Sequence, residues 1–134
     1  MAQAKEQPTS RWPPLPEGCP PDDATRQNRE FFRFTDSADQ YDWTVYVEKF
    51  GIERFAARGS DAVCRAHGLS IYPTLQSAQA AKRLVPRLRN HRIIRFRVLP
   101  YMGVAIETQP KTHHYCWWPD STFQPPPADA ELVG

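Results

Sequence analysis

The amino-acid sequence predicts an α+β fold, with two or three helices packed on a small, mostly antiparallel sheet. Three segments carry this prediction: an amphipathic helix over 75–85, an alternating strand over 92–99 and a short aromatic strand over 31–35. Helices that alternate irregularly with short strands are typical of α+β proteins. A chain of 134 residues is long enough for one domain.

Two proline-rich segments flank the predicted domain. Six prolines fall within residues 1–22, and Pro125, Pro126 and Pro127 open the C-terminal segment. Proline removes a backbone donor, and these segments have too few apolar side chains to offset the entropy lost on ordering. We therefore expect a tail over 1–28, a globular domain over 29–123 and a second tail over 124–134, both tails being disordered or bound to a partner.

The helix over 75–85 is the clearest element, because Thr74 can cap it and Pro86 can end it. A second, short helix is predicted over 61–67, ended by Gly68.

The segment from Ser37 to Gly51 is ambiguous. Tyr41, Trp43 and Val45 alternate as in a strand, whereas other apolar residues fall at helical spacing. Between the two, we favour a helix over 39–50, ended by Gly51.

The remaining strands are short. Residues 69–72 form one before Pro73, and 104–108 are expected to pair with 92–99 as a hairpin. The segment 113–118 follows, and its adjacent Trp117 and Trp118 would point to opposite faces of a strand. Either one of them is exposed and anchors a ligand or partner, or both are partly buried under the C-terminal tail.

The sequence indicates a soluble protein of a reducing compartment. It has no apolar run near the ~20 residues that a membrane span needs, and no secretory signal pattern. Its three cysteines, Cys19, Cys64 and Cys116, are odd in number and poor material for a disulfide framework. We expect a cytoplasmic location and no contact with a membrane.

Charge is distributed unevenly along the chain. Of 17 Lys and Arg residues, seven lie in a stretch without any acid: Lys82, Arg83, Arg87, Arg89, Arg92, Arg95 and Arg97. This basic segment could track the phosphates of a nucleic acid or bind an acidic protein. The simpler interpretation, which we favour, is a helix end followed by a strand with one solvated face.

A metal site is the weaker candidate. Cys64 and His67 have the spacing Cys-x2-His, and His113, His114 and Cys116 lie together, so four ligands could form a tetrahedral zinc site. Neither pair has an established finger spacing, and about fifty residues separate them. We expect no bound metal.

The run Gly68-Leu-Ser-Ile-Tyr-Pro-Thr, leading into an alanine-rich helix downstream of Arg33, resembles small ADP-ribosyltransferase-like or RES-type domains. The chain is also similar to short bacterial proteins with a G-L-S-V-Y … H-H-x-x-W pattern. The resemblance covers about residues 31–118, and it implies that the domain binds NAD or another nucleotide.

Several site roles follow from this resemblance. It implies that Arg33 meets the pyrophosphate or ribose of NAD, that Ser70 lies beside it and that Tyr72 or Trp117 stacks on a ring. Glu107 is the best-placed acid for the charge that develops at the glycosidic carbon, although it stands in no clear catalytic motif. His113 and His114 are the other candidate catalytic residues.

Two functional hypotheses remain. One is a non-enzymatic protein, such as an antitoxin, immunity protein or assembly subunit, that docks on a larger protein partner through its basic segment and tails. The other is a nucleotide-binding domain that carries out NAD glycosidic chemistry, and nucleic-acid binding is a further alternative. The interaction role on an ADP-ribosyltransferase-like scaffold is placed slightly ahead. Convergence of Arg33, Tyr72 and a histidine or Glu107 on one pocket would favour the nucleotide hypothesis.

Overall fold

The α+β prediction is confirmed by the computed structural model, which describes residues 12–134. Residues 1–11, part of the predicted N-terminal tail, lie outside the described residues. The helices are α1 (Tyr46–Phe50), α2 (Glu53–Ala56), α3 (Ser60–Ala66) and α4 (Leu75–Leu84), with short 3-10 turns at Pro86–Leu88 and Pro100–Met102. The strands are β1 (Thr25–Arg26), β2 (Arg29–Thr35), β3 (Leu69–Ile71), β4 (Arg92–Val98), β5 (Gly103–Gln109), β6 (His114–Pro119) and β7 (Glu131–Leu132).

The strands form two antiparallel sheets. One has the order β1-β5-β6-β3 and the other the order β2-β4-β7. A bridge between Phe32 and Tyr72 joins them, with each backbone N–H donating to the other residue's carbonyl at 2.7 and 2.8 Å. The end of β3 is therefore held directly against β2.

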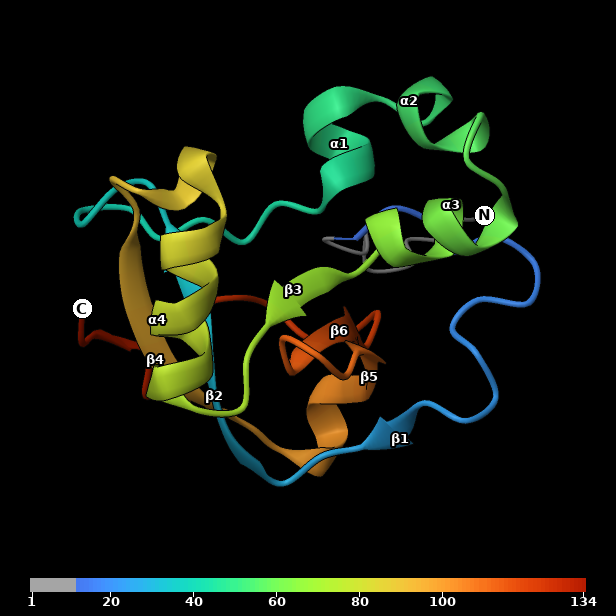
Figure 1. The fold of residues 1–134 in the computed structure, drawn as a ribbon. Coiled ribbons are helices and arrows are strands. Elements are labelled where there is room, and N and C mark those ends of the chain that lie inside the picture. The colour runs from blue at the N-terminus through green and yellow to red at the C-terminus, as the bar shows by residue number, and fades with distance from the viewer. Residues whose placement is uncertain (1–11) are drawn as a thin grey trace.

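The main core lies between the two sheets. Phe31, Phe96, Leu69 and Trp117 are fully buried there. Because side chains alternate along a strand, Phe32 and Phe34 point to the opposite face of the β2-β4-β7 sheet. There α4 covers the sheet (Figure 1), and its Ala78 and Ala81 pack in the same cluster as Phe32.

The predicted helix over 75–85 is confirmed as α4. Thr74 Oγ1 accepts a hydrogen bond from the N–H of Ser77 at 3.0 Å, and Ser77 Oγ accepts one from the N–H of Thr74 at 3.3 Å. This reciprocal capping box satisfies donors that a helix leaves open at its start. The predicted strands 31–35, 69–72 and 92–99 correspond closely to β2, β3 and β4.

The predicted helix over 39–50 is only partly correct. The helix begins at Tyr46, and the chain before it is irregular. Trp43 and Val45 are buried in the core between the sheets. Burial of these two side chains fixes the irregular chain, so over 39–45 neither the predicted helix nor the alternative strand forms.

The predicted hairpin of 92–99 with 104–108 is wrong. β4 pairs with β2 and β7, whereas β5 pairs with β1 and β6. The turn between them passes through Gly103 at φ 123°, and a Cβ there would lie 2.2 Å from the carbonyl oxygen of Trp118. This glycine turn sends the chain into the second sheet.

The two proline-rich segments pack on the domain where they are described, which corrects the expectation that they stay outside the core. Trp12 is buried, and its Nε1 donates to the carbonyl of Phe123 at 3.0 Å. At the other end, β7 forms the third strand beside β4. Apolar and aromatic side chains lie among the prolines of both segments. They bury enough surface to hold the segments on the domain, which the proline content alone did not predict.

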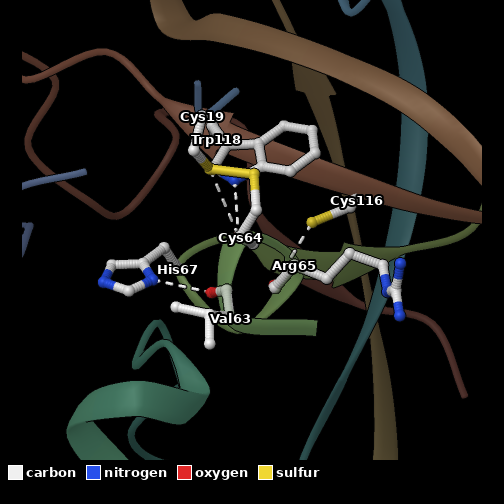
Figure 2. The surroundings of a disulfide bond; sticks show 7 residues. All are labelled: Cys19, Val63, Cys64, Arg65, His67, Cys116 and Trp118. Carbon is white, nitrogen blue, oxygen red and sulfur yellow. Dashed lines mark hydrogen bonds between the residues drawn. A yellow bond between two sulfur atoms is a disulfide. The ribbon is translucent and has the colours of Figure 1, made fainter. Parts of the chain in front are cut away.

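The cysteine prediction is also wrong, because Cys19 and Cys64 form a disulfide. It ties the N-terminal segment to α3, on the outer face of the β1-β5-β6-β3 sheet (Figure 2). Disulfides persist in oxidising environments, so the cysteine argument for a reducing compartment is withdrawn. Across residues 12–134 no helix is long and apolar enough to cross a membrane.

We expect removal of this disulfide to destabilise the domain. Cys19 and Cys64 are 45 residues apart, and closing a loop of that length stabilises a fold by up to about 4 kcal/mol in the chain-entropy account. The Cys19→Ser/Cys64→Ser variant should therefore melt several degrees below the parent chain in a thermal scan. A reductant should lower the melting temperature of the parent and leave the double variant unchanged; equal melting temperatures of parent and variant would contradict the prediction.

Candidate functional site

A cavity of about 420 Å³ lies beside the bridge that joins the two sheets. Its walls come from β2, β3, β6, α1 and α3 and from the turn after α4. This volume lies in the usual range for a small-molecule site. Arg33, Ser70, Tyr72 and His114, four of the residues singled out by sequence, all line it.

Arg33 is the central side chain of this cavity. Its Nε donates to the carbonyl of Asp42 at 2.9 Å, and its Nη1 donates to the carbonyl of Ser70 at 3.0 Å. The residue is only 6% exposed, and desolvation lowers the pKa of the guanidinium. Within residues 12–134, Arg33 forms no ion pair and its Nη2 makes no hydrogen bond.

A buried guanidinium of this kind is costly without a counter-charge. The negative charge that interacts with this guanidinium is the carboxylate of Asp42, which also lines the cavity. That carboxylate is already bonded, since Oδ1 accepts from the N–H of Thr44 at 2.9 Å and Oδ2 pairs with Lys49. These hydrogen bonds and nearby cations lower its pKa although its burial opposes them.

The cavity lining carries a large excess of positive charge. Besides Arg33 and Lys49, it includes Arg58, Arg65 and Arg87, whereas Asp42 is the single carboxylate that residues 12–134 contribute. Arg87 donates to Tyr46 Oη at 3.2 Å, while the side chains of Arg58 and Arg65 have no ion pair in the described part of the chain. Such a lining favours an anionic ligand.

Arg65 is positioned by α3, which is fixed from behind. Trp118 Nε1 donates to the carbonyl of Cys64 at 2.9 Å, and the thiol of Cys116 donates to the carbonyl of Arg65 at 3.4 Å. Figure 2 shows these contacts beside the disulfide, with the guanidinium of Arg65 pointing away from it. At the end of α3, a Cβ on Gly68 would lie 2.4 Å from Cys116 Sγ, so this close approach requires glycine.

Ser70, His114 and Thr108 form a hydrogen-bonded row on one wall. His114 Nε2 lies 2.9 Å from Ser70 Oγ, and His114 Nδ1 lies 2.6 Å from Thr108 Oγ1. Burial, followed by the positive charges of Arg65 and Arg33, lowers the pKa of His114 to about 4. The imidazole is therefore neutral at pH 7.

Cys116 also lines the cavity but is an inert thiol. It is 2% exposed, and burial raises the pKa of its thiol well above its usual range. A protonated, buried thiol is a poor nucleophile and a poor metal ligand.

Three of the residues singled out by sequence lie elsewhere. Glu107 and His113 are not in the cavity lining; they face each other at the turn between β5 and β6, with His113 Nδ1 3.5 Å from Glu107 Oε2. Trp117 is fully buried between the sheets against Phe96 and Phe123, and Trp118 is buried as well. The structure therefore places neither tryptophan where it could stack on a ligand in the cavity.

The basic segment is dispersed in space. Of its seven basic residues only Arg87 lines the cavity. On β4, Arg95 pairs with Glu131 and Glu30, and Arg97 donates to Asn28 at 3.3 Å. Acidic and amide side chains from neighbouring segments thus partner the outward face of this strand.

The candidate zinc ligands do not assemble. Cys64 is in the disulfide, and His67 Nδ1 lies 2.7 Å from the carbonyl of Val63, within its own helix region. Among the described residues, no group of three or more His, Cys, Asp and Glu side chains could hold a metal ion.

Sequence reasoning missed Asp42, Thr108, Arg65 and Lys49. Their positions depend on the irregular chain before α1, on the end of β5 and on the packing of α3, none of which has a local sequence signature. No protein-family model, curated protein or solved structure matches the chain. The predicted resemblance to ADP-ribosyltransferase-like domains therefore stays a prediction.

We expect His114 to make the domain less stable in acid. Its pKa is about 4 in the folded chain and 6.5 in the unfolded chain. As the pH falls through this window the unfolded chain takes up a proton that the folded chain does not, so the free energy of unfolding decreases, by about 3 kcal/mol in total. Denaturant unfolding of the parent and of His114→Gln at pH 7 and at pH 4 measures this difference.

The matched control is the neighbouring histidine. His113→Asn changes a largely exposed side chain at φ 58°, a conformation that asparagine tolerates. The acid-induced loss of stability should shrink in His114→Gln and persist in His113→Asn. The same loss in both variants would show that other groups cause it.

Proposed function

We propose that the chain binds a phosphorylated small molecule of the nucleotide class, NAD among them, in the cavity between the sheets. The observation that carries this proposal is Arg33, a guanidinium that is buried in the cavity wall, lies over the ring of Trp43 and has no hydrogen bond on Nη2 in residues 12–134. Two of its donors are fixed on backbone carbonyls, so the fork is held rigidly before any ligand arrives. Preorganised arginine forks bind phosphate with charge-assisted hydrogen bonds.

The surrounding charges support the same proposal. Arg65 and Arg58 line the cavity without ion pairs in the described chain, and Arg87 adds a third guanidinium. A phosphate between them would replace water at several unpaired donors and offset the mutual repulsion of the arginines. Tyr72 also lines the cavity, but it is 7% exposed and its ring already packs against Phe34 and His114, so it gives a ligand only an apolar edge.

Glycosidic chemistry on NAD has less support than binding. Glu107, the acid expected to stabilise the glycosidic carbon, is outside the cavity lining and faces His113. Among the described residues the lining has one carboxylate, that of Asp42, and it is engaged with Lys49 and a backbone N–H. We therefore limit the proposal to binding.

The interaction hypothesis stays a prediction. A basic and aromatic docking face would need free arginines and an exposed tryptophan, whereas Arg95 and Arg97 have partners and both tryptophans on β6 are buried. The convergence of Arg33, Tyr72 and His114 on one cavity favours the small-molecule proposal over protein or nucleic-acid docking.

Calorimetric titration tests the proposal with inorganic phosphate, ADP, ADP-ribose and NAD as separate ligands. We expect saturable binding of at least one nucleotide, weaker at high salt because charge drives it. Losing one charge-assisted contact costs about 1.5–3 kcal/mol, so Arg33→Lys and Arg65→Gln should each weaken binding about tenfold or more.

Arg89→Gln is the matched control, since Arg89 is exposed and lies outside the cavity lining. Arg65→Gln keeps the test valid if Arg33→Lys unfolds, because the Arg65 side chain makes no hydrogen bond in the described chain. No saturable heat with any of the four ligands, or equal affinities in parent, Arg65→Gln and Arg89→Gln, would refute the proposal.

A further inference from the structure

The row formed by Ser70, His114 and Thr108 has the geometry of an activated hydroxyl. The three residues come from β3, from the start of β6 and from the end of β5; His114 Nε2 lies 2.9 Å from Ser70 Oγ, and His114 Nδ1 lies 2.6 Å from Thr108 Oγ1. Ser70 and His114 both line the cavity, so the serine oxygen lies beside the proposed ligand.

Thr108 orients His114, because its hydroxyl contacts both the ring and the backbone carbonyl of that residue. Its hydroxyl is placed to donate to the carbonyl of His114 at 3.3 Å, which leaves its lone pairs for the N–H at Nδ1. With the proton on Nδ1, Nε2 carries the free lone pair and accepts from the Ser70 hydroxyl. This is the arrangement of nucleophile, base and orienting group that covalent catalysis uses.

We propose that Ser70 is a nucleophile toward the phosphorus of a phosphoanhydride or phosphate ester, with His114 as its general base and Thr108 as a positioning residue. The inference rests on the proposed function for the class of substrate. In the first step Ser70 Oγ forms a bond to phosphorus, its proton passes to His114 Nε2, and the bond from phosphorus to the leaving oxygen breaks. His114 returns the proton to that oxygen. In the second step water gives a proton to His114 Nε2 and its oxygen bonds to phosphorus, the bond from phosphorus to Ser70 Oγ breaks, and Ser70 Oγ regains the proton from His114, which releases phosphate or a phosphate ester.

Arg33 is placed to stabilise the charge on the transferred group. Its Nη1 donates to the backbone carbonyl of Ser70, so the guanidinium is fixed next to the nucleophile, and Nη2 makes no hydrogen bond in residues 12–134. Donors held in position before the reaction need no reorganisation as charge shifts toward the leaving oxygen.

The ligand itself would restore the basicity of His114. Burial and the positive charges of Arg65 on α3 and Arg33 on β2 keep the imidazole neutral and weakly basic in the free chain. A phosphate bound between these arginines and the imidazole adds negative charge, which favours the protonated ring. The base would thus gain strength only when substrate is present.

A biotinylated alkyl fluorophosphonate tests the nucleophile directly. Its phosphorus forms a bond to an activated serine oxygen and loses fluoride, while the serine proton leaves through the base. We expect intact-mass analysis and peptide mapping to place one label on Ser70 in the parent chain and none in Ser70→Ala. His114→Gln should slow labelling about a hundredfold, the usual contribution of a general base.

Thr108→Val separates positioning from a purely structural role. It keeps the side-chain shape but removes the hydroxyl, so labelling should slow while the thermal melt changes little. Thr112→Val, in the exposed turn, is the matched control and should label at the parent rate. Absence of label on Ser70, or labelling of His114→Gln at the parent rate in a variant with a cooperative melt, would overturn the inference.

Calorimetry on the parent chain separates the two proposals. Nucleotide binding without fluorophosphonate labelling would remove the nucleophile and leave the binding site. Labelling of Ser70 without nucleotide binding would support the nucleophile and remove the proposed substrate class.

Discussion

The buried side chain of Arg33 ties together the parts of the molecule that form the cavity. From β2 in one sheet its guanidinium donates to the carbonyl of Ser70 in the other sheet and to the carbonyl of Asp42 in the irregular chain before α1. A charge withdrawn from water needs such partners, because an unpaired buried ion costs several kcal/mol. Three segments, from both sheets and from the chain before α1, are thus fixed around one positive group.

This arrangement connects the fold with the chemistry of the cavity. The bridge between Phe32 and Tyr72 brings the edges of the two sheets together, and the cavity lies beside that junction. The disulfide and the hydrogen bonds from Trp118 and Cys116 hold α3, which supplies Arg65 to the opposite wall. The same contacts that stabilise the domain therefore keep several cations close together, an arrangement that an anionic ligand would relieve.

The sequence predicted the elements with strong local signals and missed those decided by distant contacts. Thr74 and Pro86 mark the ends of α4, and the alternation of Ile94, Phe96 and Val98 marks β4, so both were predictable. The irregular chain before α1 was not, because its conformation follows from burial of Trp43 in a core built by other segments. The disulfide was not predictable either, because the number of cysteines does not show which two sulfur atoms lie close enough to bond.

The residues of the candidate site also divide into those predicted from local sequence signals and those placed by distant contacts. Arg33, Ser70, Tyr72 and His114 were all proposed from sequence and all line the cavity, because they lie on or beside short strands that were correctly identified. Glu107 and Trp117 were proposed by residue type, and the pleat and pairing of β5 and β6 decided where they point. Thr108, one residue after Glu107, is the residue that reaches His114.

The most direct measurement is a crystal structure of the chain grown with ADP. We predict that a phosphate group of ADP lies within hydrogen-bond distance of Arg33 Nη2 and close to Arg65, between β2 and α3. A phosphate bound instead on the outer face, at Arg83 or Arg89, with water alone beside Arg33, would contradict it.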